Sequence, residues 1–295
     1  MLFEEYWPYF VVGLFLYVTV RVSYVFYKGL QKRNMGLDKK NEDFGKLNRT
    51  NQVNDVDMDK DSSSEEDGII PALPSDLKHI PFNFEKIPEE IAIAKSEEFF
   101  EMMNKRRTVR QFSKQPVPLE IIHNIIKTAG TAPSGAHTEP WTYVLVSSPQ
   151  TKQTIREIIE EEEEINYTRR MGKVWTTDLK PLRTNWVKEY LTDAPYLILV
   201  FRQTYSLRDN GNKKLHYYNE QSVSIATGFL LAAIQYAGLV SLTSTPLNCG
   251  PALRTLLERP TNEKLALLLP VGYPADDCLV PDLYRKSLKE ILVEF

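Results

Sequence analysis

The sequence divides into three stretches of very different composition, and this division confines the folded part to the last of them. Residues 6–27 are mostly apolar, with Arg21 as the interruption. Residues 35–78 are dominated by Asp, Glu, Lys, Asn and Ser, including DSSSEED at 61–67. Such a stretch cannot bury enough apolar surface to offset its conformational entropy, so we expect a disordered polar linker. Residues 79–295 have the mixed pattern of one globular domain.

The N-terminal apolar stretch predicts a membrane anchor over residues 1–34. A helix needs about 20 residues to cross a bilayer, and residues 6–27 supply that length. Arg21 lies near the end of the stretch, where its side chain can reach the headgroups. A secretory signal peptide is the alternative. It is disfavoured because no basic region precedes the stretch and no small-residue cleavage site follows it.

The charges that flank the anchor predict its orientation. Glu4 and Glu5 precede the apolar stretch, whereas three basic residues follow it, namely Lys28, Lys32 and Arg33. The positive-inside rule then makes the chain a single-pass membrane protein with residues 79–295 in the cytoplasm. Asn48 begins the glycosylation sequon NRT, which would matter only if the linker were lumenal.

The apolar periodicity of the C-terminal domain predicts both helices and strands. We expect helices over 91–106, 118–129, from 148 through the glutamates at 160–164, over 219–237 and near 251–257. We expect strands over 141–146, 196–201, 239–244 and 264–271. These elements predict an α+β fold with a central sheet and helices on its faces. Apolar residues surround most of the helix at 219–237, which indicates burial, with a second subunit as one candidate partner.

Several function classes find no support in the sequence. The sequence contains no GxGxxG, no P-loop and no GxSxG motif. It therefore gives no support for a Rossmann dinucleotide-binding protein, a P-loop NTPase or a serine hydrolase. The net charge of −3 gives no reason to expect nucleic-acid binding. The two cysteines lie far apart and the four histidines are scattered, so no metal site is expected.

Two segments carry candidate chemistry. Residues 105–110 read KRRTVR, and guanidinium groups at this spacing suit phosphate oxygens, although a solvated basic helix end gives the same pattern. Residues 132–141 read APSGAHTEPW, and the small residues in this loop let the backbone approach a planar ligand closely. An ordinary helix-to-strand connection explains the loop equally well.

Together with four further segments, these two resemble the iodotyrosine deiodinase family of the nitroreductase superfamily. The further segments are EEEEEINY at 160–167, TNWVKEY at 184–190, VSLTSTPLNCGP at 240–251 and LPVGYP at 269–274. The resemblance covers residues 79–295. It implies an FMN-binding catalytic domain with a nitroreductase-like fold, in which helices flank a central mixed sheet and two chains form an intertwined homodimer.

The resemblance also implies roles for individual residues. Ser134 and its neighbours would reach the flavin from the second subunit, and the Thr245 hydroxyl would lie near N5, where it favours single-electron steps. The Ala136 backbone N–H would donate to the substrate phenolate, so Thr245 and Ala136 are the predicted catalytic residues. The predicted FMN site consists of Arg106, Arg107, Thr108, Val109, Arg110, Pro133, Ser134, Thr243, Ser244, Thr245 and Arg285.

The predicted substrate-binding residues are Ala136 and a clamp of Glu163, Tyr167 and Lys188. An amino-acid zwitterion needs an anion for its ammonium and a cation for its carboxylate, which Glu163 and Lys188 supply. Glu163 and Tyr167 are four residues apart, so both project from one helix face. Most other glutamates at 160–164 are expected to form a solvated face. Because such a run repels itself, its helix is marginal and suits a lid that orders on the substrate.

The implied activity is FMN-dependent reductive dehalogenation of mono- and diiodotyrosine, and of bromo- and chlorotyrosine, to tyrosine and halide, which salvages iodide. NADPH is the implied ultimate reductant, acting directly or through a reductase. Two alternatives remain, a general flavin reductase for nitroaromatics or quinones, and a non-catalytic membrane-tethered flavin-binding or scaffold protein. The clamp favours the deiodinase over the reductase, because a quinone needs no zwitterion clamp.

Overall fold

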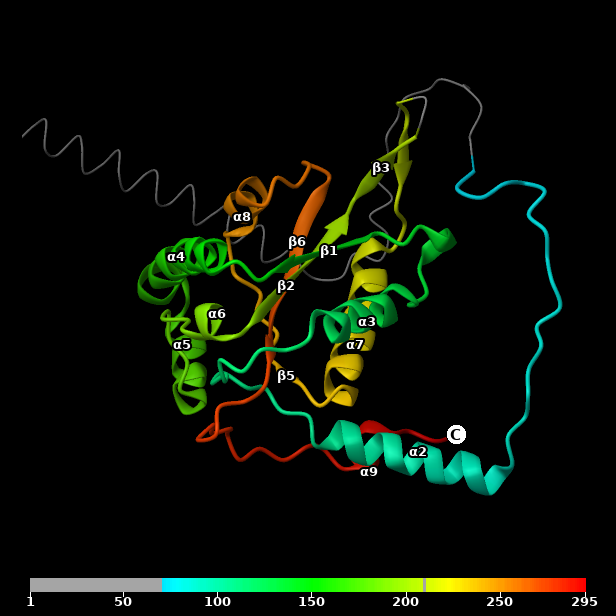
Figure 1. Cartoon of the computed structure of the whole chain (residues 1–295), viewed down its shortest axis with the longest axis horizontal. Coiled ribbons are helices and arrows are strands. Elements are labelled where there is room, and N and C mark those ends of the chain that lie inside the picture. The colour runs from blue at the N-terminus through cyan, green and yellow to red at the C-terminus, as the bar shows by residue number, and fades with distance from the viewer. Residues whose placement is uncertain (1–70, 209–210) are drawn as a thin grey trace, which may run out of the picture. The chain divides into compact units, whose positions relative to one another are not determined.

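The computed structural model describes residues 71–208 and 211–295 (Figure 1). The predicted anchor over 1–34 and most of the predicted linker over 35–78 lie outside the described residues. Residues 71–78 contain only turns, bends and irregular backbone. Within the described ranges, no helix combines the length and the apolar character that crossing a membrane requires.

A four-stranded sheet forms the centre of the fold, in the order β1-β2-β6-β5. Each pair of neighbouring strands is antiparallel. The strand ladders are therefore not mixed, contrary to the prediction. In the described residues, the parallel pairing is an isolated bridge between Thr108 and Ser241. The strands are β1 (Trp141–Val146), β2 (Tyr196–Gln203), β5 (Val240–Ser241) and β6 (Glu263–Gly272).

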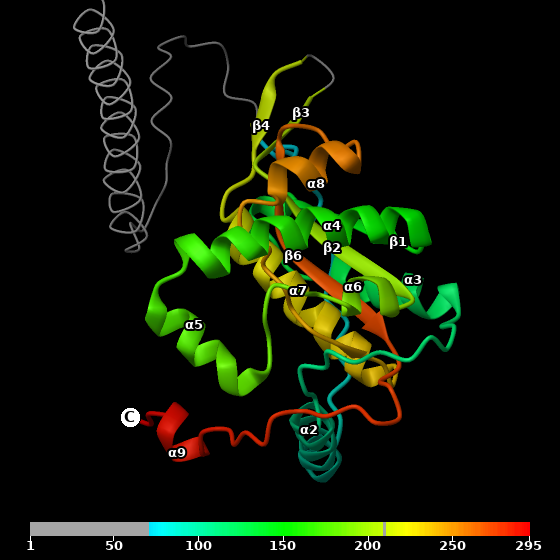
Figure 2. The same ribbon diagram turned by 90° about the vertical axis from the view of Figure 1, so that its left-hand side faces the viewer.

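Helices cover both faces of this sheet, as Figures 1 and 2 show. In β2, Leu197, Leu199 and Phe201 belong to one buried cluster, whereas Ile198 and Val200 belong to a second. Successive strand residues point to opposite faces, so β2 contributes to a core on each side. One face carries α4 (Pro149–Ile165), α6 (Tyr190–Asp193) and α8 (Gly250–Leu256), and the other carries α3 (Leu119–Gly130) and α7 (Asn219–Tyr236). The predicted α+β fold with a flanked central sheet is confirmed.

Most predicted elements occur with small shifts at their ends. The predicted strand over 239–244 is too long, because the ladder holds only Val240–Ser241, with a separate bridge from Ser244 to Leu268. The predicted helix over 91–106 is α2 (Glu89–Asn104), so Arg106 lies in the following loop. The sequence pattern did not predict the short elements α5 (Lys173–Leu179), α6, the hairpin of β3 (Tyr205–Leu207) and β4 (Lys213–Leu215), η1 (Gly135–His137), η2 (Asn166–Arg170), η3 (Lys180–Leu182) or α9 (Leu288–Ile291).

Two helices leave apolar surface open within one chain. On α7, Val223, Leu230 and Ile234 are buried, but Ile225 and Phe229 remain 45% and 39% exposed. No residue of α2 is buried, and the side chains of its two phenylalanines are open to solvent. The all-round burial expected for residues 219–237 is therefore not reached by the described part of a single chain.

Candidate functional site

The arginine segment runs alongside the edge of the sheet. The Val109 N–H donates to the Ser241 carbonyl oxygen at 3.1 Å, and Thr108 bridges to Ser241. Val109 is buried, which anchors the segment, while Arg106, Arg107 and Arg110 are half-buried. Among the residues that the structure describes, none of these three arginines forms an ion pair with a carboxylate.

This donor set fits a phosphate group. Guanidinium groups bind phosphate oxygens in a bidentate manner, and three uncompensated positive charges within a few residues repel each other until an anion arrives. The Arg107 guanidinium already donates to the Pro281 carbonyl oxygen, which fixes its position. The segment therefore offers a fixed cationic site that matches the phosphate of FMN.

Arg285 lies beside the arginine segment, although it is far away in the sequence. Its guanidinium donates to the Asn104 carbonyl at 2.9 Å, to the Asn104 side chain at 3.0 Å and to the Arg106 carbonyl at 2.7 Å. These contacts hold the C-terminal arm against the loop that follows α2. The structure thus brings Arg285 together with Arg106.

The threonines at 243 and 245 flank a residue that is tied to the sheet. Ser244 exchanges two backbone hydrogen bonds with Leu268, each 2.9 Å long. Thr243 and Thr245 are exposed whereas Ser244 is half-buried, so both threonine side chains face outward. Ser244 also contacts the hydroxyl of Tyr190, whose pKa is raised to about 12 by burial, an effect that the Ser244 hydrogen bond opposes.

The loop over 133–136 and the residues that follow it have an unusual backbone. Ala136, His137 and Glu139 all have positive φ angles, of 48°, 52° and 45°. Left-handed backbone is costly for residues with a side chain, and such strain often marks a functional site. A Cβ on Gly135 would lie 2.8 Å from the Tyr217 carbonyl oxygen, so only glycine fits there. Pro133 and Ala136 are exposed and Ser134 is half-buried.

Within one chain, this loop and the arginine segment lie at opposite ends of α7. The Gly135 N–H donates to the Ser222 hydroxyl at 3.4 Å, near the start of the helix. The Gln235 side chain donates to the Met102 carbonyl at 3.3 Å, near its end and beside α2 (Figure 1). At 1.5 Å per residue, Ser222 and Gln235 are about 20 Å apart along α7. A single chain therefore does not bring Ser134 and Ala136 to the arginines.

The three predicted clamp residues lie together. The Lys188 Nζ is 3.7 Å from the Glu163 Oε2 and 5.3 Å from the ring centre of Tyr167. The Glu163 and Lys188 side chains are 9% and 7% exposed, so this ion pair is buried. Burial lowers the pKa of Lys188, and the Glu163 carboxylate opposes that change. Lys188 Nζ also donates to the Asn185 carbonyl oxygen.

The apolar face of α4 directs Glu163 inward. The N-cap of this helix is Ser148, whose hydroxyl accepts a hydrogen bond from the Thr151 N–H at 3.3 Å. Ile155 and Ile159 are fully buried, and Glu163 follows Ile159 by four residues on the same face. The helix then continues into the π-turn η2, which carries Tyr167. Turns of this kind are frequent at functional sites.

The remaining glutamates of the run divide into two groups. Glu161 and Glu164 are exposed, as a solvated face requires. Glu160 pairs with Arg156 at 2.8 Å and accepts the Lys188 backbone N–H at 2.6 Å. Glu162 pairs with Arg170 at 2.6 Å. These countercharges, which the sequence analysis did not consider, let the whole run be helical in the structure.

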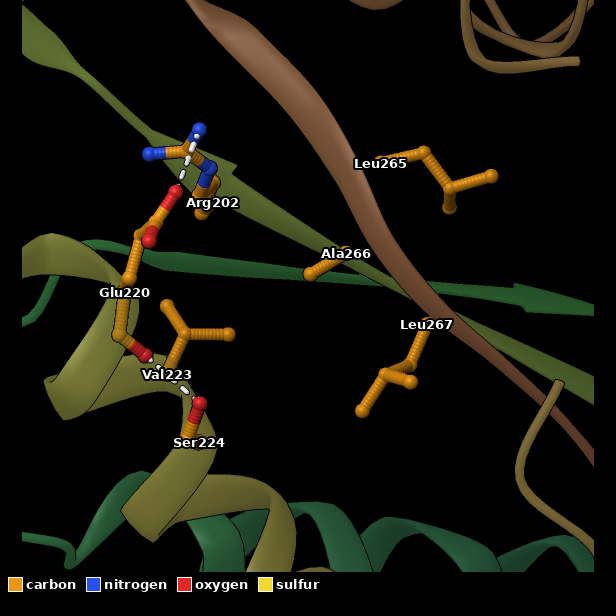
Figure 3. A pocket seen from close by; sticks show the side chains of 7 residues that line it. All are labelled: Arg202, Glu220, Val223, Ser224, Leu265, Ala266 and Leu267. Carbon is orange, nitrogen blue, oxygen red and sulfur yellow. Dashed lines mark hydrogen bonds and ion pairs between the residues drawn. The ribbon is translucent and has the colours of Figure 1, made fainter. Parts of the chain in front are cut away.

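Two cavities open on the described surface. One, of about 780 Å³, lies between the C-terminal arm at 279–283 and residues 181–190, and includes Arg110 and Tyr190 in its lining. It therefore joins the arginine segment to the chain segment that carries Lys188. The other, of about 370 Å³, lies between α7 and β6, where Arg202 pairs with Glu220 at 2.8 Å (Figure 3). It contains none of the predicted site residues.

Two buried residues of this region were missed by the sequence analysis. Asn166 is 1% exposed and contacts Glu163, and Tyr190 is 7% exposed and contacts Ser244. Both stand within motifs that carry the family resemblance, EEEEEINY and TNWVKEY. That position in the motif was the available signal, because an asparagine at a helix end is otherwise read as a cap.

Comparison with known proteins finds a matching family model, similar sequences and a similar solved structure. Residues 103–273 match the model of the nitroreductase family. The chain is 59% identical over 244 residues to an iodotyrosine deiodinase of Daphnia pulex, covering 83% of this chain and 79% of that protein. It is 64% identical over 217 residues to iodotyrosine deiodinase 1 of Mus musculus, covering 74% and 76%. A crystal structure of oxidized iodotyrosine deiodinase bound to FMN and 3-iodo-L-tyrosine matches with a TM-score of 0.58 and 32% identity, covering 67% of this chain and 98% of that chain.

Proposed function

Because the chain belongs to the iodotyrosine deiodinase family within the nitroreductase superfamily, we propose that it is an FMN-dependent oxidoreductase that dehalogenates iodotyrosines reductively. Its products are tyrosine and halide, so the reaction salvages iodide from mono- and diiodotyrosine, and bromo- and chlorotyrosine are further substrates. The observation that carries the proposal is the buried Glu163–Lys188 pair beside Tyr167.

The FMN phosphate binds to the guanidinium groups of Arg106, Arg107 and Arg110. When bound, FMN supplies the electrons that the reaction consumes. Arg285 supports this site by fixing the loop after α2, and the outward-facing Thr245 offers its hydroxyl to the flavin ring. The assignment of Thr108, Val109, Pro133, Ser134, Thr243 and Ser244 to the FMN site rests on the same family relationship.

The amino-acid part of the substrate enters between Glu163 and Lys188. The carboxylate of Glu163 binds the ammonium group, and the ammonium of Lys188 binds the carboxylate. Their present separation of 3.7 Å exceeds the roughly 2.8 Å of a tight charge-assisted bond, so the pair can exchange its weak mutual contact for two stronger ones. The Tyr167 ring, which lies beside the Lys188 ammonium, borders the same substrate site. A quinone or nitroaromatic compound would leave both charges without new partners.

The phenolate of the substrate accepts a hydrogen bond from the Ala136 backbone N–H. This donor comes from a second subunit, because the Ala136 loop lies about 20 Å from the arginine segment along α7 of its own chain. The exposed large apolar side chains of α7 and α2 support such a homodimer, since exposed apolar patches often mark protein interfaces.

The electrons come from NADPH, directly or through a reductase. Residues 1–34 anchor the chain in a membrane, and the flanking charges favour a catalytic domain in the cytoplasm. The topology can be checked by endoglycosidase treatment of the native protein. Removal of a glycan from Asn48 would show a lumenal linker and would contradict the cytoplasmic assignment.

The activity is tested with the full-length chain in detergent, loaded with FMN and reduced chemically. Mixing with 3-iodotyrosine should release iodide and tyrosine in equal amounts and reoxidise the flavin. A nitroaromatic compound and a quinone serve as competing substrates. Rapid turnover of these two without iodide release from 3-iodotyrosine would overturn the deiodinase and identify a general flavin reductase.

A further inference from the structure

Asn166 stands where α4 passes into the π-turn η2, and its side chain is almost completely buried, at 1% exposure. Its amide nitrogen lies 3.3 Å from the Glu163 Oε1 and 3.4 Å from the Leu247 carbonyl oxygen. Its amide oxygen accepts from the Arg170 guanidinium at 3.0 Å and from the Asn248 amide at 3.4 Å. A buried amide has two donors and two acceptor positions, and here all four are used.

The partners fix which way this amide points. A carboxylate and a carbonyl can only accept hydrogen bonds, and they both face the amide nitrogen. A guanidinium can only donate, and it faces the amide oxygen. A rotated amide would set oxygen against oxygen at Glu163, so the chain specifies one orientation of Asn166.

This orientation determines how Glu163 presents its carboxylate. Asn166 occupies Oε1, which leaves Oε2 facing Lys188 at 3.7 Å. The other contacts of Asn166, to Leu247 and Asn248, reach the turn that follows Thr245 by two residues. One buried amide therefore links the acid of the clamp to the segment whose threonine faces the flavin.

We propose that Asn166 is a positioning residue for substrate binding, which orients the Glu163 carboxylate toward the ammonium group of the halotyrosine and locks it to the turn at 247–248. The inference rests on the proposed function, because it takes an amino-acid ammonium as the ligand of Glu163. Asn166 itself touches neither substrate nor flavin. It acts by keeping one carboxylate oxygen engaged, so that the other remains free for the ligand.

The test uses the full-length, FMN-loaded chain and the substitution Asn166→Asp, which keeps the shape but replaces the donor by an acceptor. Dissociation constants for 3-iodotyrosine are measured by quenching of FMN fluorescence. The Glu163 carboxylate beside the new carboxyl raises the pKa of that carboxyl, whereas the Arg170 guanidinium that faces it lowers the same pKa. The neutral form donates to Glu163 as the amide does.

We therefore expect the variant to bind at least about tenfold more weakly than the wild type at high pH, with a ratio that falls as the pH decreases. The ratio cancels the titration of groups common to both proteins. The charged groups near the new carboxyl are Glu163, Arg170 and Glu162, and the groups that interact electrostatically with Glu163 include Lys188, Tyr167, Tyr190 and Cys249. FMN retention and the binding of 2-iodophenol, which has no ammonium, should stay unchanged.

A second pair of variants keeps the test decisive if Asn166→Asp does not fold. Arg170→Met removes the donor that holds the Asn166 oxygen, and it also removes the ion pair with Glu162. Glu162→Gln removes that ion pair but keeps the Arg170–Asn166 hydrogen bond. Arg170→Met should weaken 3-iodotyrosine binding severalfold, whereas Glu162→Gln should bind like the wild type.

Three outcomes count against the inference. Binding of 3-iodotyrosine within twofold of the wild type at every pH would overturn it. So would an equal loss for 3-iodotyrosine and 2-iodophenol, which would indicate general disruption, or equal effects of Arg170→Met and Glu162→Gln. A wild-type chain that fails to bind 3-iodotyrosine would instead overturn the proposed function, and the inference would fall with it.

Discussion

The predicted substrate clamp is complete within one chain, whereas the residues predicted to bind FMN lie at both ends of α7. Glu163, Tyr167 and Lys188 meet around a buried ion pair, supported by α4 and the segment at 188–194. The arginine segment and the loop over 133–136 are instead separated by about 20 Å of helix.

Under the proposed function, the two ligands therefore depend on different levels of structure. Under that function, recognition of the amino-acid part requires only a correctly folded chain, because the two clamp charges come from α4 and from the segment just before α6. By the same proposal, retention of the flavin requires a second copy to complete the site. Losing the dimer should therefore remove the flavin, while changing the clamp should leave the flavin in place.

The largest effect is expected when the phosphate contacts are removed. Arg106→Ala with Arg110→Ala should strip the flavin, because charge-assisted hydrogen bonds contribute about 1.5–3 kcal/mol each. The measurement is the ratio of flavin to protein absorbance after gel filtration. Lys105→Ala, which removes one exposed charge from the same segment, is the control and should retain FMN. Full flavin content in the double variant would refute the phosphate assignment.

The next effect concerns the proposed dimer and tests whether FMN retention depends on it. Ile225→Glu with Phe229→Glu places two charges on the open apolar face of α7, where burying an unpaired charge is prohibitive. We expect a monomer that has lost most of its FMN, measured by analytical ultracentrifugation with detection of flavin. Val174→Glu changes a side chain that is 76% exposed on α5 and serves as the control. A monomer that stays fully loaded with FMN and active would show that a single chain holds the flavin without a partner.

The sequence alone predicted the longer helices and strands but not most of the short ones. Strands such as 141–146 and helices such as 149–165 were predictable, because apolar periodicity follows from which face is buried. The hairpin of β3 and β4 carries no such pattern in its short strands. The end of β5 at Ser241 was also not predictable, since leaving a ladder depends on how β6 pairs with it.

For the site, local spacing was informative and long-range contacts were not. The four-residue interval from Glu163 to Tyr167 could be read as one helix face, although Tyr167 lies in a π-turn. That Lys188 meets Glu163, or that Asn166 reaches the 247–248 turn, follows only from packing between distant segments. The family resemblance, rather than periodicity, supplied the pairing of Lys188 with Glu163, and neither supplied the contact of Asn166.

A smaller effect is expected in the clamp. Lys188→Gln and Glu163→Gln should each keep FMN but weaken 3-iodotyrosine binding by about 2–5 kcal/mol, because a desolvated charge loses its partner. Binding is followed by quenching of FMN fluorescence, and 2-iodophenol is the matched probe without a zwitterion. Its weak binding should not respond to either substitution. Tight binding of 3-iodotyrosine by both variants would make α4 a solvated face and favour a general flavin reductase.

Thr245→Ala should affect neither ligand's affinity but should slow the reaction. The lost hydroxyl is worth about one hydrogen bond, so single-turnover iodide release should fall about tenfold. The exposed Thr255 on α8 provides a control, since Thr255→Ala keeps every residue of the predicted site. An unchanged rate of iodide release in Thr245→Ala would remove Thr245 from the predicted catalytic residues.

The smallest effect on either ligand is expected at Glu263, which contacts neither the clamp nor the arginine segment and so calibrates stability alone. Its buried carboxylate accepts from Arg259 at 2.7 and 3.0 Å and from the Thr142 hydroxyl at 2.7 Å. Burial alone would raise its pKa, but the Arg259 and Thr142 hydrogen bonds outweigh it, and the pKa is lowered. The carboxylate therefore stabilises the fold above the unfolded-state pKa of about 4.3, and this stabilisation is lost as the pH falls through the folded-state pKa.

Glu263→Gln should reduce the free energy of unfolding by about 1–3 kcal/mol at neutral pH, and the difference from the wild type should shrink below about pH 4. Denaturant unfolding at several pH values measures this difference, and a constant difference across that range would show that the charge of Glu263 contributes nothing.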